Sequence, residues 1–163
     1  NPEEGELRPQ LLDRFGLCVE VTGEKDLGMR RQIVERVLAF EGGEPEFAEK
    51  WAREDEALRG RIDKAREMLP SVEVPDHVLG AVVEVVTDLG VAGHRGDITT
   101  LKCSKALAAV KGIPLPDEEC LADAFRLSLP HRLKEDPFEE TASGRKRLDA
   151  VLTRFGAPKP GRA

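Results

Sequence analysis

The chain opens with the stretch NPEEGELRPQLLDRFGL, residues 1–17, in which apolar side chains recur at helical spacing from Leu7 onward. Pro9 suits the first turn of a helix, where its missing N–H would have no partner in any case. Gly16 suits the position just after a helix, because glycine readily adopts the left-handed conformation at which many helices end. The stretch therefore predicts a short helix over residues 9–15, with a loop before it.

The next run, LCVEV at residues 17–21, is short and rich in apolar residues, and Thr22-Gly23 follows it. This composition predicts a strand. One strand cannot form a sheet alone, because its backbone N–H and C=O groups would lack partners. We therefore expect residues 1–24 to be the end of an α/β core whose other strands come from residues before Asn1.

The rest of the chain predicts helices separated by Gly and Pro residues. They cover residues 26–40, 45–68, 78–89, 97–110 and 117–129, and a last segment runs over 136–155. Aspartates near four of these starts are the expected N-caps: Asp26, Asp76, Asp97 and Asp117. The helix over 45–68 is heavily charged with a sparse apolar stripe, which is typical of a solvated spacer.

These patterns give a mostly α fold class for the chain as a whole. After the end of an α/β core, we expect a helical connector at residues 25–73 and a C-terminal helical bundle at 74–156. Residues 157–163 read as a disordered tail.

Charge and aromatic content argue against nucleic acid as a partner. Of the 163 residues, 34% are charged, and the net charge is −6. Acidic and basic residues are interspersed, so no basic field could hold a phosphate backbone. Six Phe, one Trp and no Tyr leave few rings on which bases could stack.

The cysteines indicate a reducing compartment, and the hydropathy pattern predicts no membrane span. Cys18, Cys103 and Cys120 form no CxxC pair, so they are expected to be buried or inert thiols and not zinc ligands. No apolar run approaches the ~20 residues that a membrane span needs, and no signal peptide is recognisable. We expect a cytoplasmic protein.

Local motifs of catalysis are absent from the sequence. It has no G-x-x-x-x-G-K-[ST] loop to cradle phosphates, no H-E-x-x-H motif and no recognisable Ser-His-Asp grouping. His77, His94 and His131 are scattered, and they fit surface or capping positions better than metal binding. Composition and spacing alone therefore predict a mostly helical cytoplasmic protein without a metal site.

Three stretches carry a resemblance to a known family. NPEEGELRPQLLDRFGL (1–17) resembles the segment after the fourth core strand in the ATPase subunits of magnesium chelatases, which are AAA+ proteins. GHRGDI (93–98) and LPHRLKEDP (129–137) resemble two later segments of these subunits in order and spacing. The resemblance extends over nearly the whole chain. It departs at KCSK (102–105), where relatives usually carry RAAR, and at His94, where Leu is common.

The resemblance implies roles for five residues. Asn1 matches sensor 1, whose amide helps to place the attacking water near the γ-phosphate. Arg14 matches the arginine finger, which reaches a nucleotide on the neighbouring subunit, a task that suits a permanently charged guanidinium. Asp13 would orient Arg14 or bridge subunits, and Arg8 is a second interface candidate. Arg95 matches sensor 2, where a helix start favours a nearby anion. Judged by residue type alone, the arginines would be surface residues and Asn1 a turn residue.

The same resemblance implies a function. The intact protein would be an ATPase motor subunit that couples ATP hydrolysis to metal insertion into a porphyrin, with residues 74–156 as its lid domain. ATP and Mg²⁺ would be held mainly by Walker A and Walker B motifs within the ~200 residues before Asn1. This chain lacks both motifs, so it would be inactive alone.

The implied partners are copies of the same subunit in a ring, expected to be a hexamer, with a second AAA+ subunit and a large porphyrin-binding subunit. The location would be the cytoplasm, or the plastid stroma in a phototrophic eukaryote. Alternatives stay open: an ATPase subunit of a cobalt chelatase, a MoxR-type AAA+ chaperone, or a helical module that only docks partners.

Overall fold

The structure is a computed structural model that describes residues 9–19, 21, 23–133 and 143–154. All regular secondary structure in these residues is helical, which confirms the mostly α fold class. The chain divides into two compact units: residues 1–19 together with 65–163, and residues 20–64. We describe each unit by itself.

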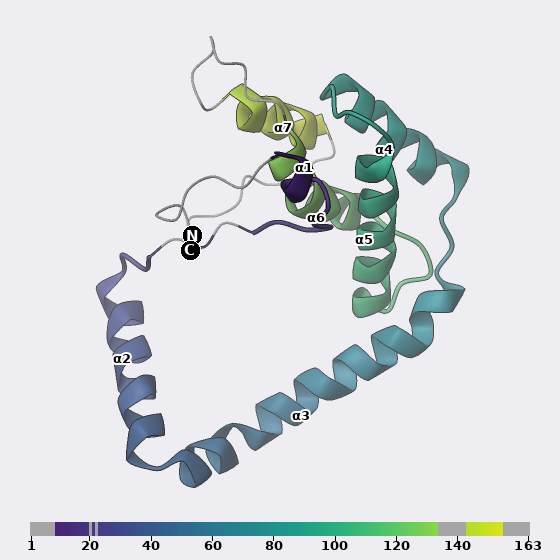
Figure 1. The fold of residues 1–163 in the computed structure, drawn as a ribbon. Coiled ribbons are helices and arrows are strands. Elements are labelled where there is room, and N and C mark those ends of the chain that lie inside the picture. Colours follow the sequence, from purple (N-terminus) through teal and green to yellow (C-terminus); the bar gives the residue numbers. More distant parts are fainter. Residues whose placement is uncertain (1–8, 20, 22, 134–142, 155–163) are drawn as a thin grey trace. The chain divides into compact units, whose positions relative to one another are not determined.

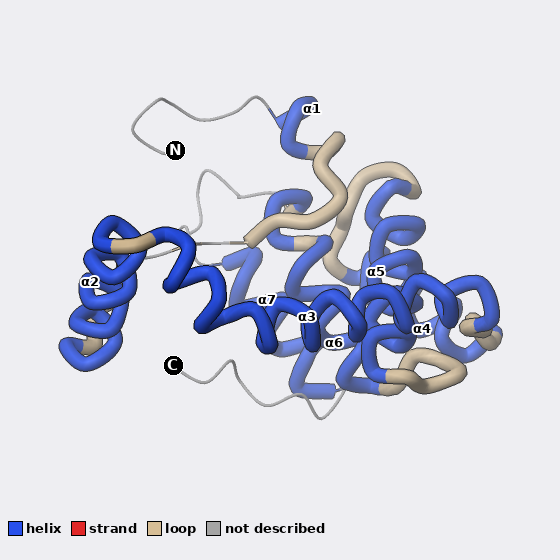
Figure 2. Tube along the Cα trace, turned by 90° about the horizontal axis from the view of Figure 1, so that it is seen from below, coloured by secondary structure: helices blue, strands red, loops and turns tan. Residues whose placement is uncertain are grey.

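The first unit is a helical bundle around α4 (Asp76–Asp88), α5 (Arg95–Lys111), α6 (Glu118–Ser128) and α7 (Ser143–Arg154) (Figure 1). Short elements complete it: α1 (Pro9–Leu12) and the 3₁₀ turns η2 (Leu69–Ser71) and η3 (Pro130–Arg132). Helix α5 packs most extensively against α6, and α4 packs against α5 (Figure 2). The main apolar core comprises Val78, Val82, Val85, Val86, Leu89, Leu121, Ala122, Phe125, Leu129, Leu148, Val151 and Leu152.

The core follows from the spacing of apolar residues. On α4 the buried valines recur every three or four positions, so that they form one stripe that faces the bundle. Among the larger side chains, Phe125 and Leu129 are completely buried. Gly112 ends α5 in the left-handed conformation, with φ of 72°, which confirms the predicted stop at this residue.

Two of the four predicted N-caps are confirmed. Asp26 accepts the backbone N–H of Met29, and Asp117 accepts that of Cys120 at 2.7 Å. Burial alone would raise the pKa of Asp117, but its hydrogen bonds with Cys120 and the nearby Lys111 lower this pKa below its usual value.

The other two caps are wrong. The helices α4 and α5 begin at Asp76 and Arg95, with Pro75 and His94 at the N-cap positions, so that Asp76 and Asp97 both lie inside the first turn. A carboxylate there still complements the partial positive charge of the helix end, which is why the two positions look alike in sequence.

The predicted strand over residues 17–21 is also wrong, since its described residues have no regular secondary structure. No neighbouring strand is available among the described residues to complete a ladder. Instead the N–H of Cys18 donates to the carbonyl of Leu127 at 2.8 Å, which ties the segment to α6. The preceding helix is shorter than predicted: α1 ends at Leu12, a turn follows, and Gly16 does not have a positive φ.

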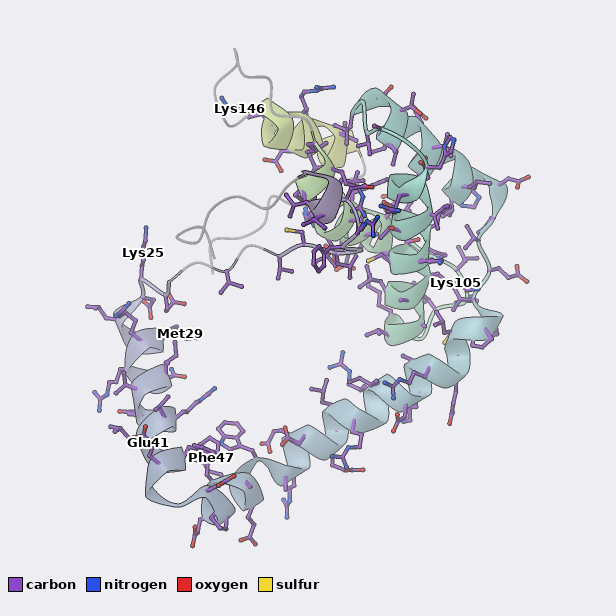
Figure 3. The ribbon with its side chains drawn as sticks, viewed as in Figure 1. Lys25, Met29, Glu41, Phe47, Lys105 and Lys146 are labelled. Atoms are coloured by element: carbon purple, nitrogen blue, oxygen red, sulfur yellow. The ribbon has the colours of Figure 1, made fainter. Side chains whose placement is uncertain are left out.

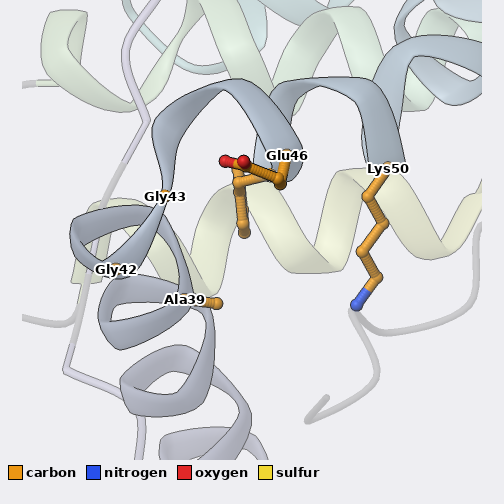
Figure 4. Close-up of a pocket in the computed structure, with 6 residues that line it drawn as sticks. Ala39, Gly42, Gly43, Glu46 and Lys50 are labelled. Atoms are coloured by element: carbon orange, nitrogen blue, oxygen red, sulfur yellow. The ribbon is translucent and has the colours of Figure 1, made fainter.

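The second unit contains α2 (Leu27–Gly42) and most of α3 (Glu44–Met68), which confirms the helices predicted over 26–40 and 45–68 and the break between them at Gly42-Gly43. No residue of α2 is buried, and Ala65 is the only buried residue of α3. Phe47, labelled in Figure 3, lies near the start of α3. Its ring packs edge-on against that of Phe40, with 5.7 Å between the ring centroids, and lies beside that of Trp51. A shallow hollow is lined by Ala39, Gly42, Gly43, Glu46, Phe47 and Lys50 (Figure 4).

Candidate functional site

Two arginines that are distant in sequence converge on one aspartate in the first unit. Arg95, in the first turn of α5, donates from Nη1 to Asp13 Oδ2 at 2.6 Å and to the Asp13 carbonyl at 3.1 Å. Arg132, in η3, places Nε 3.4 Å from Asp13 Oδ1. Because Asp13 follows α1 directly, its carboxylate connects the segment after α1 to both α5 and η3.

The side chain of Arg132 is the buried member of this group, with 1% of it exposed, against 51% for Arg95. Its Nη2 donates to the Phe15 carbonyl at 2.7 Å and to the Asp13 carbonyl at 3.3 Å. Its Nη1 donates to the Gly16 carbonyl at 3.2 Å and also bonds the Ser128 carbonyl. We call Asp13, Arg14, Phe15 and Gly16 the finger turn, after the role that the resemblance implies for Arg14; three of its four carbonyls accept from this one guanidinium.

Electrostatics at the cluster favour a neutral histidine beside two cations. Burial lowers the pKa of Arg132, while the Asp13 carboxylate opposes that shift and Arg95 adds to it. Burial also lowers the pKa of His131, against a raising effect from the Phe15 carbonyl, which lies 3.0 Å from its Nε2. An uncharged imidazole avoids adding a third positive charge next to a single carboxylate.

The sequence around Arg95 explains how its backbone reaches this place. Gly93 has a φ of 72°, a conformation that few other residues adopt, and it turns the chain into α5. Gly96 lies against α4 so closely that an added Cβ would be 3.0 Å from a methyl of Val91 and 3.4 Å from one of Val86. These glycines let the start of α5 approach the core, and so they place Arg95.

This close approach gives a prediction for stability. Gly96→Val is expected to destabilise the chain by about 1–3 kcal/mol, because extra carbons must displace packed valines. Gly80→Val is the matched control: Gly80 lies on the exposed side of α4, and a Cβ there would meet nothing within 4 Å. Urea unfolding followed by circular dichroism compares the two, and equal losses of stability would contradict the packing described for Gly96.

The residues singled out from the sequence have different outcomes. Asn1 and Arg8 lie outside the described residues. Arg14 is exposed, in the finger turn, where its backbone N–H donates to the Leu11 carbonyl at 3.0 Å. Asp13, predicted to orient Arg14 or bridge subunits, binds Arg95 and Arg132 in this chain. The structure thus brings Arg95 and the finger turn together, a contact that sequence reasoning did not foresee.

Sequence reasoning missed Arg132 and assigned its neighbour His131 to the surface or to a cap. Both residues belong to the stretch LPHRLKEDP, which was noted only for its resemblance. No local pattern distinguishes Arg132 from the other charged residues of this stretch, because its partners in residues 13–16 lie more than 100 positions away in sequence.

Other candidate chemistry in the described residues is sparse. No group of three His, Cys, Asp or Glu side chains there could hold a metal ion. Cys103 and Cys120 are buried free thiols, as predicted; burial raises the pKa of both, that of Cys120 to about 11, and Cys18 is half-buried. Within the parts of the chain that can be described, every helix is too short or too polar to cross a bilayer.

Comparisons with known proteins now add to this geometry. The model of the AAA lid domain matches residues 80–151, which include Arg95, Arg132 and the helices that carry them. A magnesium-chelatase subunit ChlI homolog of Methanocaldococcus jannaschii is 41% identical over 155 residues, which are 95% of this chain and 42% of that protein.

The chain is a homologue of magnesium-chelatase ChlI subunits.

Further relatives agree with this assignment. The magnesium-chelatase 38 kDa subunit of Acidiphilium rubrum is 42% identical over 95% of the chain and 45% of its own length. The ChlI subunit of Cyanophora paradoxa is 44% identical over 95% of the chain and 44% of its own length. The chain thus spans less than half the length of these relatives, and its residues 80–151 match the AAA lid domain.

Proposed function

We propose that this chain supplies the lid and the arginine finger of an AAA+ ATPase subunit in a magnesium-chelatase complex, where ATP hydrolysis drives metal insertion into a porphyrin. The observation that carries the proposal is the ion pair between Asp13 and Arg95, with 2.6 Å between Nη1 and Oδ2. This ion pair brings Arg95, the proposed sensor 2 residue, next to the finger turn, which contains Arg14. In support, the AAA lid match includes Arg95, and the alignment with the ChlI homolog of Methanocaldococcus jannaschii covers 95% of the chain.

In this proposal Arg14 and Arg95 act on the same nucleotide. Arg14 is exposed and adjacent in sequence to Asp13, and about half of the Arg95 side chain, which pairs with the Asp13 carboxylate, is exposed. In the proposal both guanidiniums belong to the same subunit boundary. A phosphate held by the neighbouring subunit would meet both, and their permanent charge would stabilise the negative charge that spreads over its oxygens during transfer.

The described residues fit the phosphate and not the metal ion. Guanidiniums bind phosphate oxygens through paired N–H donors, but Mg²⁺ requires oxygen ligands, and no group of three or more His, Cys, Asp or Glu side chains among the described residues could hold a metal ion. We assign Mg²⁺ and most contacts to ATP to residues outside this chain, with Asn1 as sensor 1 at its start. The chain's own contribution is to present two cations and to hold them in place.

The wider assembly follows from the same proposal. Residues 1–24 would end the α/β core, residues 25–73 would be the connector, and residues 74–156 would be the lid. Arg8 and Asp13 would lie at the interface of a homo-oligomeric ring, expected to be a hexamer, in the cytoplasm or the plastid stroma. A second AAA+ subunit and a large porphyrin-binding subunit would complete the complex, and this chain would not itself bind the porphyrin.

The experiment is ATP turnover by the full-length protein with Arg95→Ala. We expect kcat to fall about 10²–10³-fold, the usual loss when one donor to a transition-state oxygen is removed. Arg147→Ala is the control, because Arg147 is an exposed arginine of the same bundle that donates to the Asp88 carbonyl at 3.1 Å. An unchanged kcat for Arg95→Ala would refute the sensor role.

A second experiment measures insertion of Mg²⁺ or Co²⁺ into a porphyrin in the presence of candidate partner subunits. It separates a magnesium chelatase from a cobalt chelatase, a chaperone or a docking module.

A further inference from the structure

The buried guanidinium of Arg132 has no part in the roles assigned above. We infer that Arg132 is a positioning residue that fixes the finger turn against the bundle, and thereby sets the place and direction from which Arg14 reaches the nucleotide. The inference rests on the proposed role of Arg14 as the finger.

The pattern of hydrogen bonds is the first support. Arg132 Nη2 donates to the carbonyls of Asp13 and Phe15, which are the residues on either side of Arg14. Nη1 reaches the Gly16 carbonyl at 3.2 Å, and Nε lies 3.4 Å from the Asp13 carboxylate. One planar fork therefore contacts the backbone before and after Arg14. That restricts the backbone torsions from which the Arg14 side chain projects.

The anchor of Arg132 is the second support. Its Nη1 also bonds the Ser128 carbonyl at the end of α6. The Ser128 hydroxyl donates to the Ala124 carbonyl, so the Thr100 hydroxyl, 2.6 Å away, must be the donor in the bond between the two side chains. Both hydroxyl residues are buried, and Thr100 lies on α5, the helix that begins with Arg95. Arg132 thus connects the finger turn to the packed pair of helices that also carries Arg95.

The weak apolar packing of the finger segment is the third support. The side chains of Leu11, Phe15 and Leu17 are 47%, 58% and 49% exposed, so burial of apolar surface does little to hold this segment. Polar contacts must do so, and the contacts of Arg132 with this segment are partly buried, where hydrogen bonds are stronger than in water. Lysine could not replace it, because a single ammonium cannot span carbonyls on both sides of Arg14.

The test uses the full-length protein with Arg132→Met, which keeps much of the side-chain volume and removes every donor. Arg147→Met is the control: Arg147 is an arginine of α7 in the same bundle, and it donates to the Asp88 carbonyl at 3.1 Å. We expect amide hydrogen exchange over residues 13–19 to become about 10-fold faster in Arg132→Met alone, which corresponds to a loss of about 1.4 kcal/mol of local stability.

Measurements of ATP turnover distinguish a positioning role of Arg132 from a general role in stability. For Arg132→Met we expect kcat to fall about 10- to 100-fold, as when a catalytic group is misplaced by about 1 Å, with KM for ATP within about twofold. The double variant Arg14→Ala/Arg132→Met should turn over no more slowly than Arg14→Ala, because Arg132 acts through Arg14. If Arg132→Met does not assemble, Arg132→Lys keeps the charge, loses the fork, and should show the same exchange and kcat changes in smaller degree.

The outcomes separate this inference from the proposed function. If Arg14→Ala abolishes turnover while Arg132→Met changes neither kcat nor exchange over residues 13–19, the positioning role is wrong and the finger stands. If exchange accelerates but Arg14→Ala leaves turnover unchanged, the finger assignment fails, and the role of Arg132 in catalysis fails with it. A double variant much slower than Arg14→Ala would also overturn the inference, since Arg132 would then act by another route.

Discussion

Replacing Arg14 with alanine is expected to remove nearly all ATP turnover from rings of the full-length protein. Arginine fingers supplied by a neighbouring molecule accelerate hydrolysis about 10³–10⁵-fold in GTPases, and a loss of similar size is expected here. Arg14 suits this role because it is exposed and because both flanking carbonyls are bonded to Arg132, so that its backbone is fixed while its side chain is available. The measurement is single-turnover hydrolysis with saturating ATP.

Mixed rings show whether the residue acts across the subunit boundary. Subunits with Arg14→Ala are mixed with subunits whose phosphate-binding lysine is replaced. Activity should return, because some interfaces then pair an intact nucleotide site with an intact finger. Arg59→Ala is the control, since Arg59 is an exposed arginine of α3 that pairs with Glu56 at 3.3 Å. Turnover within about twofold of wild type for Arg14→Ala would end the finger assignment, because loss of a transition-state contact must lower kcat.

Local patterns predicted the helices well, because helix formation depends on residues three or four positions apart. The valine stripe of α4, the glycine that ends α5 and the cap at Asp117 are all signals of this kind. The caps assigned to Asp76 and Asp97 were displaced by one and three residues, since an acidic residue is favourable at the N-cap and in the first turn alike. The sequence therefore predicts which segments are helical better than it predicts the residue at which each helix begins.

The contacts of the candidate site could not be predicted from local sequence patterns, because they join residues far apart in sequence. Arg95 and Asp13 are 82 positions apart, and Arg132 and Gly16 are 116 apart. No periodicity encodes such a pair. The resemblance drew attention to Arg14 and Arg95, which are exposed, but it gave no reason to separate Arg132 from the other charged residues of its segment. The strand over residues 17–21 failed for a related reason: a strand needs a partner, and composition does not supply one.

The packing beneath the cluster gives the second large expected effect. Leu129→Ala is expected to destabilise the chain by about 2–5 kcal/mol, because the leucine is completely buried and its removal leaves a cavity. Leu79→Ala is the matched control, since Leu79 on α4 is 42% exposed, and it should cost less than about 1 kcal/mol. Urea unfolding of the two variants, with the slope of the transition checked for constancy, measures the difference.

Leu129 also connects core stability to the site, because its carbonyl accepts the backbone N–H of Arg132 at 2.8 Å. A cavity at position 129 would let η3 shift, and the guanidinium of Arg132 would move with it. Leu129→Ala should therefore also speed amide exchange in the finger turn, whereas Leu79→Ala should not. Equal effects of the two substitutions on stability would show that Leu129 is not packed as described. A large loss of stability without any change in the finger turn would show that Arg132 is held independently of the core beneath it.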